Sequence, residues 1–279
     1  MMYKQTMTYV LLTGLVLTAA SGVCQTSNDA LRTKLESYVA AAEKDRIEIE
    51  FDLFQEKMDP RVLEDCYGRT ADVDLQALCV KLLQVAGDKQ SVRWLNTIYH
   101  GADVLAQTEV LVSLSVLDKP SGLHLARGAL ASPDDEVFRV AMFVLSESSS
   151  AEDWQLMKGY LSNTNEKRRS AALLSAHPPK GDQKAEHEMM VALIESSKHP
   201  AEAVRLTVVQ RLSYDRNDYA ESILSSMVLD DQSLTVREKA LGLLLFIVRY
   251  GARESPERTP AAPEPKRVRP LLPRTIGGK

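Results

Sequence analysis

The sequence predicts an all-α fold, an α-solenoid in which antiparallel helix pairs stack one after another. Three observations favour it. Aromatic residues make up 6% of the 279-residue chain and glycine occurs 13 times, which leaves few of the residues that build strands and tight turns. Capping residues precede apolar positions at helical spacing along most of the chain. One helical pattern also recurs with a period in the thirties. An irregular helical bundle is the alternative.

Charge and hydropathy exclude several classes of protein. The chain carries 34 basic and 38 acidic side chains, a net charge of −4, whereas a nucleic-acid-binding chain is expected to be basic. We therefore expect no nucleic-acid partner. The apolar fraction of 44% excludes global disorder and a polytopic membrane protein.

The N-terminus has the pattern of an export signal. Lys4 is the only charged residue before an apolar run over 10–20, and Ala20 and Gly22 occupy the −3 and −1 positions of a cleavage site. The run is shorter than the roughly 20 residues of a membrane span. We therefore predict a signal peptide over 1–22 and an exported chain in the periplasm or cell envelope. A retained membrane anchor and a buried N-terminal helix are the alternatives.

Cys24 allows a second interpretation of the same segment. A bacterial lipoprotein signal ends in a small residue followed directly by the Cys that receives the lipid, and Val23 departs from this pattern. Lipidation at Cys24 would anchor the exported chain as a lipoprotein. We expect contact with a membrane only through a retained or lipidated N-terminus.

Helices are expected from position 28 to about position 250. The segment 23–58 is interpreted as a linker and a capping helix, because Ile47, Phe51, Phe54 and Met58 share a helical face and a lone strand would have no partner. A short helix follows Asp59, with Pro at its first position. Further helices are predicted at about 72–86, 88–100, 103–117, 119–131, 133–147, 151–161, 165–176, 182–197, 200–213, 218–229 and 233–250.

Four stretches repeat one helical pattern. The clearest runs from Asp231 through Val236, Arg237 and Ala240, and weaker copies begin at Ser132, Asn163 and His199. These four starting positions, interpreted as helix caps, are separated by 31, 36 and 32 residues. A period in this range, with two helices in each unit, is typical of an α-solenoid.

This pattern resembles the HEAT-repeat family of armadillo-type solenoids, whose short form runs Asp-Pro-x-x-x-Val-Arg-x-x-Ala-x-x-x-Leu and continues with Gly-Asp and a second helix. The resemblance covers about 70–250 and implies a right-handed solenoid of about five units over 59–252. In the family the Asp and Arg form a ladder between units. Asp231 and Arg237 match that pair, and Arg205 keeps the Arg half behind His199.

The resemblance, the export signal and the lack of catalytic motifs together predict a non-enzymatic scaffold that presents a curved surface to a protein partner of unknown identity in the cell envelope. By the family's geometry the second helices carry that surface: 88–100, 119–131, 151–161, 182–197 and 218–229. The alternatives are a regulatory or non-catalytic subunit of an envelope enzyme complex, and an assembly factor that binds through its tail.

Trp94 is the preferred contact residue on these helices. It lies at the edge of its apolar stripe beside Arg93 and near Thr97, which makes these three residues candidates for protein contact. Trp154 also falls on a second helix. A place in the core is the commoner fate of a Trp.

The segment 253–279 differs in composition from the rest. From position 252 on, the chain holds six of the 12 prolines and a net charge of +4, so we expect a disordered tail. Lys266, Arg267 and Arg269 form its basic cluster. Such a cluster is either a solvated tail or a docking motif for an acidic partner.

Patterns of catalytic and metal sites are lacking, so we expect no catalytic residues, no metal and no cofactor. His187 and Glu188 begin like a zinc-protease motif, but no second His follows at the required spacing. We interpret them as part of an exposed, charged helix face. The serines at 146 and 148–150 and the paired Asp residues at helix starts are interpreted as capping groups.

Cys66 and Cys79 are predicted to form a disulfide. Cys66 is near the end of the short helix that follows Asp59, and Cys79 is about two turns into the next helix, so the two lie near the same level of an antiparallel pair. An exported protein is in a compartment where disulfides persist. Two buried free thiols are the alternative.

Overall fold

The all-α prediction is confirmed. The computed structural model describes residues 28–148, 150–214 and 218–251, and within these ranges it holds 14 α-helices and no strand. The predicted signal peptide 1–22, Cys24 and the predicted tail with Lys266, Arg267 and Arg269 lie outside the described residues. None of the described helices is long and apolar enough to cross a membrane.

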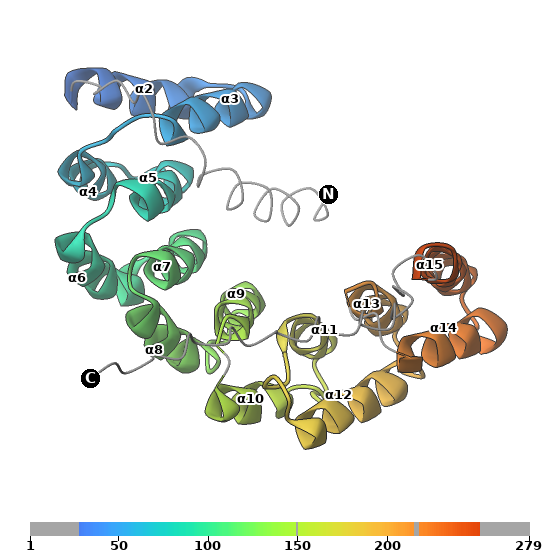
Figure 1. Cartoon of the computed structure of the whole chain (residues 1–279). Coiled ribbons are helices and arrows are strands. Elements are labelled where there is room, and N and C mark those ends of the chain that lie inside the picture. Colours follow the sequence, from blue (N-terminus) through green and yellow to red (C-terminus); the bar gives the residue numbers. More distant parts are fainter. Residues whose placement is uncertain (1–27, 149, 215–217, 252–279) are drawn as a thin grey trace, which may run out of the picture. The chain divides into compact units, whose positions relative to one another are not determined.

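The helices follow one another with short connections (Figure 1). Their bounds are α2 Asn28–Ala40, α3 Glu43–Phe54, α4 Pro60–Arg69, α5 Val73–Ala86, α6 Lys89–Ile98, α7 Val104–Leu117, α8 Lys119–Ala129, α9 Asp135–Ser146, α10 Ala151–Lys158, α11 Glu166–Ser175, α12 Gln183–Ser196, α13 Glu202–Leu212, α14 Asp218–Asp230 and α15 Leu234–Gly251. A short 3-10 helix, Tyr99–Gly101, follows α6.

The chain divides into two compact units, Met1–Arg211 and Leu212–Lys279. In the first unit α5 packs against α7, α7 against α9, and α9 against α11, so these helices form one continuous row. The helices α6 and α8 pack against α7, and α10 packs against α9. In the second unit α14 packs against α15.

Most helices of the first unit begin at an acidic or amide cap. The side chains of Asp72, Asp88, Asp103 and Asp182 each accept a hydrogen bond from a backbone N–H in the first turn of α5, α6, α7 and α12. These bonds satisfy N–H groups that have no partner within the helix. Local sequence thus fixes where these helices start.

The predicted caps of the repeats lie two residues too early. The residues that cap α9 and α11 are Asp134 and Asn165. Ser132 and Asn163 instead accept hydrogen bonds from the backbone N–H groups of these caps, at 3.2 and 2.8 Å. The side chain two residues before each cap therefore stabilises the turn that leads into the helix.

The same turn recurs at the other copies of the pattern. His199 Nδ1 accepts from the backbone N–H of Ala201 at 3.1 Å, and Asp231 Oδ1 accepts from that of Ser233 at 2.8 Å. Thr70 Oγ1 accepts in the same way from Asp72 N at 3.1 Å. One local structure thus recurs at the start of α5, α9, α11, α13 and α15.

The expected first helix is divided in two. α2 ends at Ala40 and α3 begins at Glu43, and Ile47, Phe51 and Phe54 lie in α3. Its buried residue is Leu53, whereas Ile47 and Phe51 are exposed. The predicted helical face is therefore wrong for these two residues, and Met58, although buried, lies beyond the end of α3.

Side-chain bonds in the first unit join residues about one repeat apart. Ser113 Oγ donates to the Val80 carbonyl at 3.0 Å, 33 residues away, and links α7 to α5. Arg168 Nε donates to Asp135 Oδ1 at 3.0 Å, also 33 residues away, and links α11 to α9. Lys158 pairs with Glu188 at 2.9 Å across 30 residues.

Arginines at the start of first helices bind backbone carbonyls of helix starts. Arg168 donates to the carbonyl of Ser132 at 2.7 Å, in the preceding copy of the pattern. Arg205 is buried and donates at 2.8 Å to the carbonyls of His199 and Pro200, in its own copy. The ladder expected for Asp231, Arg237 and Arg205 therefore stays a prediction. An Asp–Arg contact between neighbouring copies of the pattern is formed by Arg168 and Asp135.

Candidate functional site

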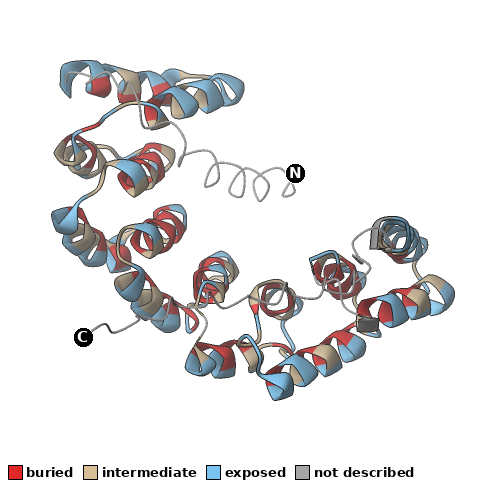
Figure 2. Cartoon of the chain, viewed as in Figure 1, coloured by how far each residue is buried: buried red, intermediate tan, exposed pale blue. Residues whose placement is uncertain are grey.

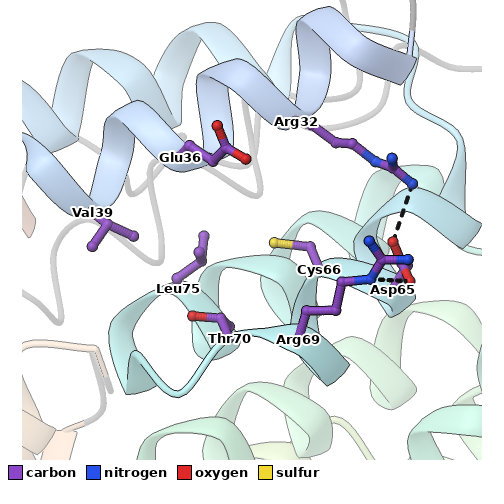
Figure 3. A pocket seen from close by; sticks show the side chains of 8 residues that line it. All are labelled: Arg32, Glu36, Val39, Asp65, Cys66, Arg69, Thr70 and Leu75. Atoms are coloured by element: carbon purple, nitrogen blue, oxygen red, sulfur yellow. Dashed lines mark hydrogen bonds and ion pairs between the residues drawn. The ribbon is translucent and has the colours of Figure 1, made fainter.

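A surface pocket of about 420 Å³ lies where α2 faces α4 and α5 (Figure 3). α2 contributes Arg32, Glu36 and Val39. The remaining lining residues come from α4, from its C-cap and from α5: Asp65, Cys66, Arg69, Thr70 and Leu75. This volume is in the range of small-molecule sites.

Local sequence positions the wall that carries Cys66. Asp59 caps α4 with Pro60 at its first position, and the helix closes where the Thr70 backbone N–H donates to the Cys66 carbonyl at 3.1 Å. Asp72 then caps α5. The short link returns the chain so that α4 and α5 pack together.

Charges are unevenly distributed over the pocket. Asp65 pairs with Arg32 at 3.1 Å and with Arg69 at 2.8 Å, so one carboxylate serves two guanidinium groups. Glu36 is exposed and has no ion pair with another described residue. The end with the arginines therefore has a surplus of positive charge, and the Glu36 side is negative.

Cys66 and Cys79 are free thiols in the structure, and their side chains are close enough for a hydrogen bond between them to shift both pKa values. That bond lowers the pKa of the Cys66 thiol against the opposing effect of burial. The same bond, together with burial, raises the pKa of the Cys79 thiol. Sequence reasoning placed the two side chains near one another, and they are; the disulfide itself stays a prediction.

The candidate contact residues on α6 have different surroundings. Trp94 is half-buried and meets the ring of Tyr67 edge-on at 5.2 Å. Thr97 Oγ1 donates to the Trp94 carbonyl at 2.6 Å, and Arg93 is exposed. The other Trp, Trp154 on α10, is fully buried. A contact role for Arg93, Trp94 and Thr97 thus stays a prediction.

Of the serines predicted to cap a helix, Ser150 has that role, whereas Ser146 lies in α9 and donates to the Phe143 carbonyl. Ser150 caps α10, and its hydroxyl and that of Ser148 both donate to the buried Asp153 carboxylate. Arg127 binds the same carboxylate through two bonds, at 2.7 and 2.9 Å. These groups lower the pKa of Asp153 to about 2, and Arg127 makes the largest contribution. The cluster is a structural link between α8 and α10.

The exposed face around His187 is charged, as expected. His187 is exposed and its neighbour Glu188 pairs with Lys158. Among the described residues, no three His, Cys, Asp or Glu side chains come together in a group that could hold a metal ion.

An exposed apolar stripe on α15 was missed by sequence reasoning. Leu234, Leu241, Leu245 and Val248 are 61%, 42%, 60% and 58% exposed, and their spacing of seven, four and three residues places them on one helical face. Val236 and Ala240, on another face of the same helix, are fully buried. The spacing was visible in the sequence, but both faces are apolar, so periodicity alone could not tell which one is covered.

No protein-family model matches the chain, and a comparison with curated proteins finds no match. The resemblance to HEAT repeats therefore rests on the residue pattern alone.

Proposed function

We propose that this chain is an exported, non-enzymatic scaffold with a right-handed HEAT-like solenoid fold, and that it binds a partner protein along the apolar stripe of α15. The observation that carries the proposal is the stripe itself, Leu234, Leu241, Leu245 and Val248. At 1.5 Å per residue its ends are about 21 Å apart, the length of a helix–helix contact.

The solenoid part is supported by the period of the contacts. Bonds between helices in the first unit span 30 to 33 residues in the cases of Arg168, Ser113 and Lys158. One type of turn also recurs where the sequence pattern recurs. Units that each contact mainly their neighbours produce contacts of this kind.

The borders of the stripe favour a protein as the partner. Arg237 and Glu238 are exposed and fall between Leu234 and Leu241, one toward each side of the stripe. An apolar centre with polar groups of both signs around it is the usual composition of a protein interface.

The alternative is an assembly factor that binds through Lys266, Arg267 and Arg269 in the segment 253–279. A second alternative is a non-catalytic subunit of an envelope enzyme. The first predicts that deletion of 253–279 abolishes partner binding, whereas the stripe predicts that binding survives the deletion.

The test is a site-specific photocrosslinker placed at Leu245 in the native cell. The matched control carries the probe at Val116, an apolar residue near the C-terminal end of α7 that is 55% exposed. We expect one defined adduct from Leu245, none from Val116, and an unchanged adduct when 253–279 is deleted. Equal crosslinking from both sites, or crosslinks from Leu245 to the chain's own 253–279, would contradict the proposal.

Export has its own test, because it rests on residues 1–22. The N-terminal sequence of the mature protein is expected to begin between Ser21 and Gln25. A mature chain that still begins at Met1 contradicts export, and a lipid on Cys24 establishes the lipoprotein alternative.

A further inference from the structure

The pocket between α2 and α4 contains a thiol that is open to solvent on one side and backed by a second thiol. Cys66 lines the pocket and is partly exposed, whereas Cys79 is fully buried. Figure 3 shows the Cys66 sulfur directed into the space between α2 and α5. A molecule in the pocket can therefore contact Cys66, whereas Cys79 does not line the pocket and exposes no surface to solvent.

The charges around Cys66 select the kind of molecule. Arg32 and Arg69 share Asp65 as their acidic partner, and they leave positive charge that attracts a carboxylate. Glu36 lies one turn further along α2 than Arg32, lines the same pocket, and attracts an ammonium group. A ligand with both an ammonium and a carboxylate group matches this arrangement better than one with a single sign of charge.

We propose that the pocket binds a small disulfide whose halves are zwitterionic aminothiols, and that Cys66 and Cys79 exchange with it. Cystine and the disulfides of short peptides that contain cysteine share this chemistry. The proposal is independent of the scaffold function, because it concerns residues of α2, α4 and α5 and none of α15.

The exchange is balanced by the bound disulfide, which is the oxidant. The Cys66 thiolate attacks one sulfur of the ligand, a Cys66–ligand disulfide forms, and the other half leaves as a thiolate that takes up a proton. Cys79 then loses its proton and attacks the Cys66 sulfur. The second half of the ligand leaves as a thiol. The pair has lost two electrons and two protons, and the ligand has become two thiols.

The order of attack follows from the surroundings of the two thiols. The hydrogen bond from Cys79 favours the thiolate of Cys66, and the thiolate is the reactive form. The bond to Cys66 is also the largest cause that keeps Cys79 protonated. Once Cys66 carries the mixed disulfide, that cause no longer acts, and burial alone still raises the pKa of Cys79.

The test uses the reduced full chain with Cys24→Ser, so that only the pair reacts. Cystine is the zwitterionic probe, cystamine the cationic one and 3,3′-dithiodipropionate the anionic one. Intact-mass measurement follows formation of the mixed disulfide in a Cys79→Ser variant. Oxidised glutathione is the probe for peptide disulfides. We expect cystine to react at least about tenfold faster than the cationic and anionic probes, as two weak ion pairs allow.

Three variants make the result decisive. Cys66→Ser is expected to abolish modification, whereas the parent chain is expected to proceed to a Cys66–Cys79 disulfide and release both halves of cystine. Glu36→Gln is expected to reduce the preference for cystine over the anionic probe, and Glu43→Gln, an exposed change on α3, to leave it unchanged. Helical circular dichroism checks that each variant is folded.

Two outcomes would overturn the proposal. One is reaction of all three probes within about twofold of each other in a folded Cys79→Ser chain, which would show that the charges do not select. The other is modification of Cys79 in the Cys66→Ser chain, which would show that Cys66 is not the point of entry.

Discussion

The central helices α7 to α10 and the last helix α15 differ in how much of their apolar surface is covered. α7 packs against α5, α6, α8 and α9, and its buried residues, which include Leu111 and Leu114, lie on nearly all sides of the helix (Figure 2). Within its own unit α15 packs against α14, and four apolar side chains on one face stay exposed. Both helices occupy the first position of a predicted helix pair. This difference indicates that the first helix of a pair is fully covered only where other helices pack against it on both sides.

The largest effect is expected from truncating one leucine in each of α7 and α15. Leu111→Ala on α7 removes a side chain that is fully buried and should destabilise the protein by about 2–5 kcal/mol. Leu245→Ala on α15, where the side chain is 60% exposed, should change stability by no more than about 0.5 kcal/mol. The free energies of unfolding from urea denaturation make the comparison. Similar losses for both variants would mean that the stripe is covered in the isolated chain.

Adding one methyl group is expected to have opposite effects in the two regions. A Cβ at Gly122 of α8 would come within 2.6 Å of the Ser115 backbone, at the contact with α7, so Gly122→Ala should destabilise by about 1–3 kcal/mol. A Cβ at Gly242 of α15 meets nothing within 4 Å, and Gly242→Ala should stabilise by about 0.5–1 kcal/mol through the helix propensity of Ala. Melting temperatures that shift in the same direction would contradict this account.

The covered face of α15 is expected to be tightly packed. Ala240 is fully buried, so Ala240→Leu should overpack the face and destabilise by about 1–3 kcal/mol. Lys239→Leu, a change at the adjacent exposed position, is the control and should have little effect on the urea midpoint. An Ala240→Leu chain as stable as the parent would show that α15 lies in a different rotation about its axis.

The smallest effect concerns the acid stability of the central helices. The folded chain holds the pKa of Asp153 at about 2, mainly through Arg127, whereas the unfolded carboxyl has a pKa near its ordinary value of 3.8. As the pH falls from about 5 towards 2, the unfolded chain takes up this proton first, so stability is lost. We expect about 1–2 kcal/mol of loss from this group, because Arg127 is partly exposed and solvent screens the pair.

The Asp153 prediction is checked by urea denaturation at several pH values. In Asp153→Asn the fall in stability between pH 5 and pH 2 should be smaller than in the parent by that amount. Glu152→Gln, the neighbouring exposed position, is the control. Parallel curves for Asp153→Asn and the parent would refute the role of the ionised carboxylate.

Much of the helical structure was predictable because its signals are local. Asp72, Asp88 and Asp103 sit directly before apolar periodic segments, and the helices begin where these caps predict. The displacement of the caps at Ser132 and Asn163 was not predictable, because the turn and the cap two residues later use the same residue types. Local patterns likewise gave no sign of the break between α2 and α3, which lies at Ala41 and Ala42.

The candidate sites were predictable only in part. The helical positions of Cys66 and Cys79 brought the two thiols together, because the α4–α5 turn is short. The pocket above Cys66 was not foreseen, because Arg32 and Glu36 come from α2, about 30 residues earlier. A contact over that separation depends on packing, and no pattern within one helix encodes it.

Amide hydrogen exchange on the isolated full chain tests most directly the claim that α7 is enclosed while α15 is an open surface. Exchange depends on local opening, and opening is easier where few side chains cover a helix. We expect the amides of the central turns of α7 to exchange on the order of a hundredfold more slowly than those of α15 between Leu241 and Val248. Equal protection of the two helices would contradict the account, because it would mean that the apolar stripe is already covered and is not available to a partner.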